Sequence, residues 1–254
     1  MFDPAGMPPP LPRIQDTATR PTGGLDHHFE VYDRRQREVS KIPLNTDTAC
    51  QLRANYAGKV ALIDAHIGRI LDVIEARGEL DNTILVFTSD HGEMNGDHGL
   101  VYKSNFLNGA ARIPLVISTP AMRASQSGGG ICASPAELID VGATLADLAG
   151  ATWDWEQFGV SLAPTLDTPG ARHREDALCE FEGEVMLLTD RWKAAINREG
   201  QLYLLIDRQA DADEQHNLAG CPEHRETGDR LRLRILERLA QSQKQQAICG
   251  YICS

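Results

Sequence analysis

The apolar residues between positions 56 and 74 recur with the period of an α-helix. Their spacings of four, three, four, three and four place them on one helical face, called here the apolar stripe: Tyr56, Val60, Ile63, Ile67, Ile70 and Ile74. Asn45 and Thr46 suit the start of this helix, and Gly78 suits the position just after its end. We expect the apolar stripe to pack in the core, against the strand that follows.

Two short apolar runs after this helix predict strands. Ile84–Phe87 is an unbroken apolar run with β-branched and aromatic members, which is typical of a strand buried on both faces of a parallel sheet. Ile113–Ile117 predicts a second strand, with Pro114 near its start, where a missing N–H is tolerated. The helix and the first strand therefore predict an α-then-β unit.

A connector and a second helix follow the second strand. The glycine-rich and serine-rich segment 121–130 predicts a flexible connector. Ser134–Glu137 has the sequence of a capping box with proline at the first helical position, and predicts a helix start there. Apolar residues at helical spacing continue to Leu148, and Gly150 ends the helix.

The pattern changes from about Arg174. Three short strand-like runs, Val185–Leu188, Trp192–Ile196 and Leu202–Ile206, are separated by turn sequences and predict an antiparallel meander. A last helix is predicted from Glu223 to Ser242, and the end of the chain beyond it is expected to fray.

These elements predict a mixed α/β protein in three parts. Residues 1–44 contain seven prolines and predict extended chain rather than helix or central strand. Residues 45–173 predict part of an α/β domain with flanking helices, and residues 174–254 predict a small subdomain with an antiparallel sheet and a C-terminal helix.

Composition narrows the classes of partner. The 254 residues carry a net charge of −11 with lysines and arginines scattered among acids, so nucleic acid is not an expected partner. No apolar run approaches the ~20 residues of a membrane-spanning helix, and the first residues do not resemble a signal peptide, so we expect a cytoplasmic protein. The six cysteines lack the spacing of a disulfide framework or a structural zinc site.

Candidate chemistry follows the first strand directly. Asp90 and His91 come just after its end, where ligands gather in open α/β sheets, and Lys103 follows twelve residues later. A carboxylate, an imidazole and an ammonium suit a divalent cation bound beside a tetrahedral anion. Taken alone, the triplet Asp90–Gly92 favours a simple turn after the strand, with Lys103 in solvent.

The longer stretch is more specific than this triplet. The run FTSDHGE, the later GDHGL, the pair YK and the strand GAARIPLVI resemble the metal-binding segment of the sulfatase family, in the alkaline-phosphatase-like superfamily. The resemblance implies that Asp90 and His91 are metal ligands and that Lys103 is a catalytic lysine facing the sulfate group. His98, in GDHGL, is either a loop residue or a supporting residue behind the ligands.

The resemblance also suggests a fold, a cofactor and a substrate class. It continues through Trp192–Lys193 and Asn217–Ala219, and covers only the carboxyl-terminal half of the family. It implies a divalent metal, calcium first, with manganese or magnesium as alternatives, and a small sulfate or phosphate ester as substrate. Many sulfatases carry asparagine where this chain has His91, and the Asp–His version also resembles hydrolases of phosphonate monoesters and phosphodiesters.

The nucleophile motif of this family, Cys or Ser followed by x-Pro/Ala-x-Arg, is not met in the sequence. The runs beginning at Cys132 and Cys221 misplace the proline and do not qualify. We therefore expect the chain to be inactive alone. It is either part of a hydrolase whose amino-terminal half lies elsewhere or a non-catalytic remnant that serves as a binding or structural half. An exposed apolar strand edge would then favour an oligomer or an obligate partner.

Overall fold

The computed structural model describes residues 2–16, 30, 44–125, 129–152, 157–168 and 170–250, with the side chains of 15, 16 and 243–250 left out. The chain divides into two compact units. The first unit comprises Met1–Arg13 and His28–Gly129, and the second comprises Ile14–His27 and Gly130–Ser254. Most of the proline-rich segment predicted to be extended lies outside the described residues, and the predicted division at residue 174 stays a prediction.

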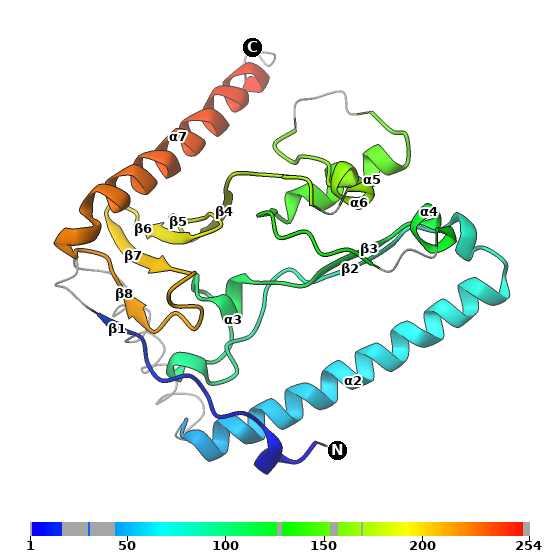
Figure 1. Cartoon of the computed structure of the whole chain (residues 1–254), viewed down its shortest axis with the longest axis horizontal. Helices are drawn as coiled ribbons and strands as arrows, with labels where there is room; N and C mark the ends of the chain where they lie inside the picture. The colour runs from blue at the N-terminus through cyan, green and yellow to red at the C-terminus, as the bar shows by residue number, and fades with distance from the viewer. Residues whose placement is uncertain are drawn as a thin grey trace. The chain divides into compact units, whose positions relative to one another are not determined.

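The first unit is dominated by α2, Thr46–Ala76, a single long helix (Figure 1). Its start is a capping box in which the Asn45 side chain accepts from the Thr48 N–H and the Thr48 hydroxyl accepts from the Asn45 N–H, both at 2.9 Å. Arg77 is the C-cap residue of the helix, and Gly78 follows with φ +67°, a left-handed conformation that favours glycine. The predicted helix and both of its end signals are confirmed.

The predicted burial of the apolar stripe is wrong. Val60, Ile63 and Ile70 are each half exposed or more, and α2 buries only Ala49 and Ala54 completely. Small residues make the close contacts of this helix, because a Cβ placed on Gly96 would lie 2.7 Å from the Ala49 Cβ. The described residues therefore do not cover the side of α2 that the sequence marks as its core face.

The two predicted strands are present, but they pair differently from the expectation. β2, Leu85–Thr88, and β3, Leu115–Ser118, are antiparallel, with Phe87 opposite Val116. In the described part of the chain they form a two-stranded sheet. Phe87 is 45 % exposed and Val116 is 59 % exposed, so the expectation of a strand buried on both faces of a parallel sheet is wrong here. Two strands cannot cover both of their own faces.

Short helices connect these strands to their surroundings. The 3₁₀ turn Leu80–Asn82 joins α2 to β2, and α3, Asn108–Ala111, precedes β3. Residues Pro120–Ala124 form α4, capped by the Thr119 hydroxyl, which accepts from the Met122 N–H at 3.2 Å. The predicted flexible connector is therefore helical over its first residues. Thr119 supplies the cap and Pro120 suits the first helical position.

The second unit contains two short helices, α5, Ile139–Leu148, and α6, Ala163–Asp167. The predicted helix start at Ser134 is wrong, because the Ser134 hydroxyl oxygen accepts from the N–H groups of His173 and Arg174, at 2.9 and 3.0 Å. A distant segment thus uses the atom that a cap would need. Gly150, with φ +67°, follows the helix as predicted.

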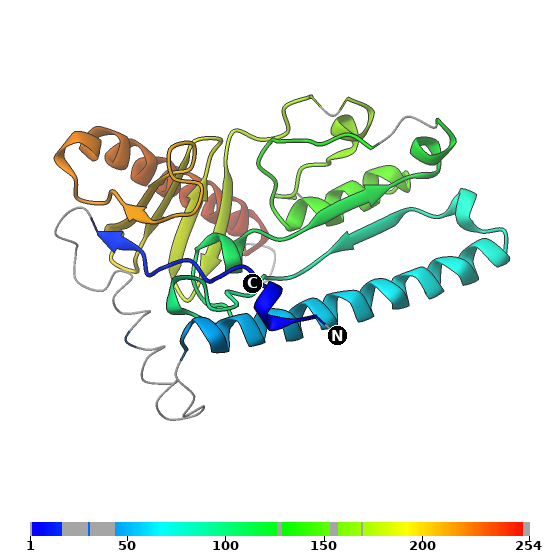
Figure 2. The same cartoon turned by 60° about the horizontal axis from the view of Figure 1, so that its bottom comes forward.

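An antiparallel sheet with one long helix makes the rest of this unit (Figures 1 and 2). Its strands are β4, Ala177–Phe181, β5, Glu184–Leu188, β6, Trp192–Ile196, and β7, Leu202–Asp207, in that order. The short strands β1, Gln15–Asp16, and β8, His216–Asn217, pair in parallel. α7, Arg225–Gly250, packs on β5, β6 and β7. The predicted meander and final helix are confirmed, and the mixed α/β class with them.

The core of the second unit lies between α7 and the sheet. Leu187, Ala194, Leu205 and Ile235 are each at most 1 % exposed and belong to one apolar cluster. β4 was not predicted, because its sequence, ALCEF, neither alternates nor contains a β-branched residue. Among the described residues, no helix is both long and apolar enough to span a membrane.

Candidate functional site

The segment that follows β2 carries the predicted site residues, all in the first unit. The Thr88 hydroxyl donates to the Pro114 carbonyl oxygen at 2.9 Å, which ties the end of β2 to the residue before β3. The next hydroxyl, that of Ser89, donates to the His91 carbonyl oxygen at 2.8 Å. These bonds fix the backbone on both sides of Asp90, so its carboxylate leaves the strand end in a defined direction.

Gly92 is required by close packing. A Cβ at this position would lie 2.1 Å from the Gly109 carbonyl oxygen, and real Cβ atoms do not come so close to a backbone atom. The Gly92 N–H donates to the Ala110 carbonyl oxygen at 2.8 Å, which docks the segment on α3. The glycine after His91 therefore allows the backbone of the site to lie directly against α3.

Asp90, His91 and Lys103 come together. The Lys103 Nζ lies 2.6 Å from the His91 Nε2, and an Asp90 carboxylate oxygen, Oδ2, lies 3.4 Å from the same nitrogen. The His91 Nδ1 lies 2.9 Å from the Gly92 carbonyl oxygen and donates to it, since a carbonyl only accepts. Nε2 is then the nitrogen that carries a lone pair, and it faces both charged groups.

Charge and exposure at this trio favour an ionised carboxylate. The Asp90 side chain is 79 % exposed and the His91 side chain 40 % exposed. Desolvation acts to raise the pKa of Asp90, but the hydrogen bond from the His91 N–H and the nearby positive charge of Lys103 act against it, and the pKa lies below its usual value. Asp90 therefore presents a negatively charged oxygen at neutral pH.

The donor set fits two neighbouring ligands of one cation. With ligand bonds of roughly 2.4 Å meeting at a right angle, two donor atoms lie about 3.4 Å apart, which matches the separation of Asp90 Oδ2 and His91 Nε2. In the ranges that the structure describes, no group of three or more histidine, cysteine, aspartate or glutamate side chains could hold a metal ion. Asp90 and His91 could therefore supply two of the six to eight ligands that calcium takes.

A loop from Glu93 to Gly99 is held to α2 by an ion pair that sequence reasoning missed. An Arg53 guanidinium nitrogen lies 2.5 Å from the Asp97 Oδ1, and the same oxygen accepts from the Leu11 N–H at 2.7 Å. The Arg53 Nε also donates to the Asn95 carbonyl oxygen at 3.0 Å. Asp97 lies 44 residues from Arg53, so neither spacing nor periodicity could have identified the pair.

His98 is a loop residue, which is one of the two interpretations that the sequence allowed. It lies in the 3₁₀ turn Asp97–Gly99 with φ +56°, is 2 % exposed, and its N–H donates to the Leu11 carbonyl oxygen at 2.9 Å. These contacts make it part of the packing between the loop and the first residues of the chain.

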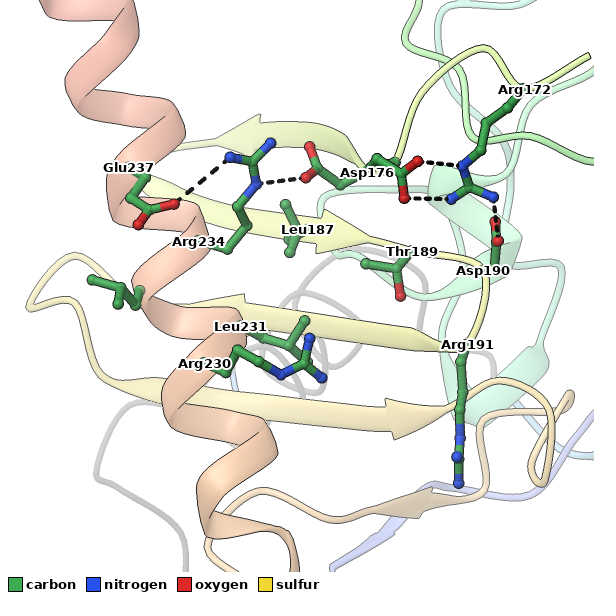
Figure 3. Close-up of a pocket in the computed structure, with 12 residues that line it drawn as sticks. Arg172, Asp176, Leu187, Thr189, Asp190, Arg191, Arg230, Leu231, Arg234 and Glu237 are labelled. Carbon is green, nitrogen blue, oxygen red and sulfur yellow. Dashed lines mark hydrogen bonds and ion pairs between the residues drawn. The ribbon is translucent and has the colours of Figure 1, made fainter.

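The second unit has a separate hollow of about 450 Å³ beside α7 and β5 (Figure 3). Its walls are charged: Arg172 pairs with Glu175 and Asp190, and Arg234 pairs with Asp176. Its lining includes none of the predicted site residues. Because these arginines are already neutralised, the hollow is best explained as the edge of the α7 packing.

The segment that carries Asp90, His91 and Lys103 lies within a region that matches a known protein family. Residues 23–151 match the sulfatase family. The chain belongs to the sulfatase family. It is 34 % identical over 183 residues to the choline-sulfatase of Rhizobium meliloti (strain 1021), a match that covers 67 % of this chain and 33 % of that protein. This sulfatase-family chain therefore spans about a third of that curated relative.

Solved structures extend the match beyond residue 151. The phosphonate monoester hydrolase SpPMH from Silicibacter pomeroyi is 25 % identical with a TM-score of 0.75, over 95 % of this chain and 52 % of that one. A structure named BT4656, in complex with its substrate D-glucosamine-2-N,6-O-disulfate, is 28 % identical with a TM-score of 0.61, over 87 % of this chain and 47 % of that one. The sulfatase-family chain thus has the alkaline-phosphatase-like fold over most of its length.

The two cysteines that nearly match the sulfatase nucleophile motif lie in the second unit. Cys221 is buried and comes directly before the 3₁₀ turn Pro222–His224. Cys132 is half-buried, and its Sγ lies 3.9 Å from the Ala171 carbonyl oxygen. Neither is placed as an exposed nucleophile at the end of a buried strand.

Proposed function

We propose that this chain supplies the cation-binding and anion-binding part of a metal-dependent hydrolase of small sulfate esters. The observation that carries the proposal is the convergence on the His91 Nε2 of the Lys103 ammonium, at 2.6 Å, and the Asp90 carboxylate, at 3.4 Å. Family membership and the 34 % identity to a choline-sulfatase support sulfate esters as the substrate class.

Each residue has a role that its chemistry allows. Asp90 and His91 would hold the divalent cation, with calcium favoured and manganese or magnesium as alternatives. When bound, such a cation neutralises oxygens of the transferred group and orients the nucleophile. The Lys103 ammonium would face the same tetrahedral group and stabilise the charge that develops on it. Because the His91 Nδ1 donates to Gly92, the neutral imidazole has its lone pair on Nε2, the atom that would hold the cation.

Turnover by this chain alone is not part of the proposal. The formylglycine motif does not occur in the 254 residues, and two ligands leave a cation dependent largely on water. We expect weak cation binding, in the millimolar range, and no useful hydrolysis. A chain that neither binds cations nor hydrolyses esters would instead fit the structural remnant considered from the sequence.

A phosphonate monoester or phosphodiester is the second candidate substrate. Two observations favour it: the TM-score of 0.75 to a phosphonate monoester hydrolase, and a histidine at position 91. Sulfate and phosphonate groups are both tetrahedral anions, so Lys103 suits either. The leaving group, rather than this trio, would decide between them.

The test is calorimetric titration of the chain with calcium, magnesium and manganese. Asp90→Asn should reduce the affinity for the preferred cation at least tenfold, whereas Asp64→Asn, an exposed change on α2, should not alter it. Assays with 4-nitrophenyl sulfate and bis(4-nitrophenyl) phosphate should show no turnover. Equal cation binding by the wild-type chain and Asp90→Asn would refute the proposal, and turnover that disappears in Lys103→Ala would refute the expected inactivity.

A further inference from the structure

Lys103 lies between two residues with an uncommon backbone conformation. Tyr102 has φ +66° and Ser104 has φ +78°, in the left-handed region that residues other than glycine rarely adopt. The Tyr102 side chain is exposed, so packing of its ring does not hold it in place. Such a conformation persists only when surrounding contacts fix it, and such residues cluster at functional sites.

The contacts that fix this backbone come from the segment just after the proposed metal ligands. The Met94 N–H donates to the Tyr102 carbonyl oxygen at 2.9 Å, and the Tyr102 N–H donates to the Glu93 Oε1 at 2.5 Å. The Glu93 Oε1 also accepts from the Asn95 N–H at 3.2 Å. One carboxylate oxygen of the half-buried Glu93 therefore joins its own turn to the loop that carries Lys103.

We propose that Glu93 is a positioning residue that sets the Lys103 ammonium at the anion site. Lysine has a flexible stem, and its ammonium can be directed only if the backbone at its base is fixed. Glu93 accepts from the N–H of Tyr102, the residue before Lys103, and it follows His91 by two residues. It thus fixes the backbone from which the Lys103 stem extends relative to the cation ligands, and it need not touch the substrate. This inference rests on the proposed function and adds the residue that holds the site's two parts in register.

The alternative explanation is that Glu93 only stabilises the fold. An NMR signal from the Lys103 side chain distinguishes a positioning role from a purely structural role. The chain has five lysines, and reductive methylation with ¹³C labels them without removing their charge, so each exposed lysine gives its own NMR signal. The Lys103 signal is assigned by its absence in Lys103→Arg. Sodium sulfate is titrated in the presence of calcium, with sodium chloride as the control for ionic strength.

We expect sulfate to shift the Lys103 signal in the wild-type chain. In Glu93→Ala the apparent affinity for sulfate should fall about tenfold while the affinity for calcium changes less than twofold. Glu93→Gln should restore sulfate binding to within about twofold of wild type, because the amide oxygen still accepts from the two N–H groups. Glu75→Ala, an exposed change on α2, should match wild type.

The outcomes separate this inference from the proposed function. Wild-type sulfate affinity in Glu93→Ala, or failure of Glu93→Gln to restore it, overturns the positioning role and leaves the proposed function standing. No sulfate response at Lys103 in the wild-type chain overturns both. If Glu93→Ala loses sulfate and calcium binding together with thermal stability, and Glu93→Gln does the same, Glu93 is structural and the inference is wrong.

Discussion

The Lys103 Nζ lies 2.6 Å from the His91 Nε2. The ammonium thus donates to the lone pair of Nε2 that a metal ion would need. The ammonium and the cation cannot both occupy it, so cation binding at Asp90 and His91 requires Lys103 to turn away from the imidazole. The ammonium is then released toward an anion beside the cation. The pair thus links the two halves of the proposed site through one nitrogen atom.

This competition predicts that Lys103→Ala raises calcium affinity. The substitution removes both the competitor for Nε2 and a positive charge close to a divalent ion. In this exposed site the repulsion is screened to the order of 1 kcal/mol, so the gain should be about fivefold. Calorimetric titration measures it, with Lys59→Ala on α2 as the control. Unchanged or weaker calcium binding in Lys103→Ala would show that Lys103 does not compete.

A second prediction concerns Gly92 and its close approach to α3. Gly92→Ala places a Cβ 2.1 Å from the Gly109 carbonyl oxygen, and backbone atoms cannot move aside cheaply. We expect a loss of about 2 kcal/mol in the free energy of unfolding, typical of overpacking, together with weaker calcium binding. Urea denaturation of Gly92→Ala and wild type measures the change.

The control for Gly92 is Gly58→Ala, in the interior of α2 where nothing lies within 4 Å of the added Cβ. This change should stabilise the chain by about 0.5–1 kcal/mol, because alanine favours a helix more than glycine does. Opposite signs for the two changes would tie the cost at Gly92 to its contact. A Gly92→Ala variant as stable as wild type would mean that the segment after His91 can shift.

The parts of the fold that were predicted are those with local signals. The Asn45–Thr48 capping box and Gly78 act within a few residues, and the structure has both ends of α2 where these residues place them. Asp90 and His91 are adjacent in sequence, and Lys103 lies in the same motif. The convergence of these three was therefore visible in a single stretch, although their roles as ligands and as an anion contact stay predictions.

The parts that were missed depend on distant partners. Ser134 has a capping sequence, but its oxygen binds the N–H groups of His173 and Arg174, about 40 residues away. Arg53 reaches Asp97 across 44 residues. The apolar stripe was correct as a pattern and wrong in its burial, because periodicity identifies the face of a helix but not the segment that covers it.

A third prediction concerns the buried Asp140 carboxylate of the second unit. It accepts from the Arg174 guanidinium at 2.5 and 2.9 Å and lies 2.8 Å from the His173 Nε2. Desolvation acts to raise its pKa, but the hydrogen bonds from Arg174, Val160 and the other partners outweigh it and lower the pKa. We expect Asp140→Asn to lower the free energy of unfolding by about 3 kcal/mol at pH 7, as for a buried ion pair that loses one partner.

The pH dependence of this effect has a definite sign. A carboxyl whose pKa is lower in the folded state stabilises fully above its unfolded value, near 4, and loses that contribution as pH falls through the folded value. The gap in urea stability between wild type and Asp140→Asn should therefore be widest above about pH 5 and narrow below about pH 4. Asp229→Asn, an exposed change on α7, should show no gap at either pH. A gap that stays constant into acid would contradict the role of the ionised carboxylate.

The exposed apolar stripe of α2 gives the last prediction. Its six residues extend along about 27 Å of helix, and the described residues leave Val60, Ile63 and Ile70 at least half exposed. Apolar area of this extent in water favours self-association or an obligate partner. The double variant Ile63→Lys, Ile70→Glu should reduce association in sedimentation velocity runs over a tenfold range of concentration. Because both side chains are already exposed, it should change the free energy of unfolding by less than about 0.5 kcal/mol.

The control for this prediction is Ile235, a buried residue on α7. Ile235→Ala should lower the free energy of unfolding by several kcal/mol. If the α2 double variant is instead as destabilised as Ile235→Ala, the stripe is covered within this chain, and no partner is needed to explain it.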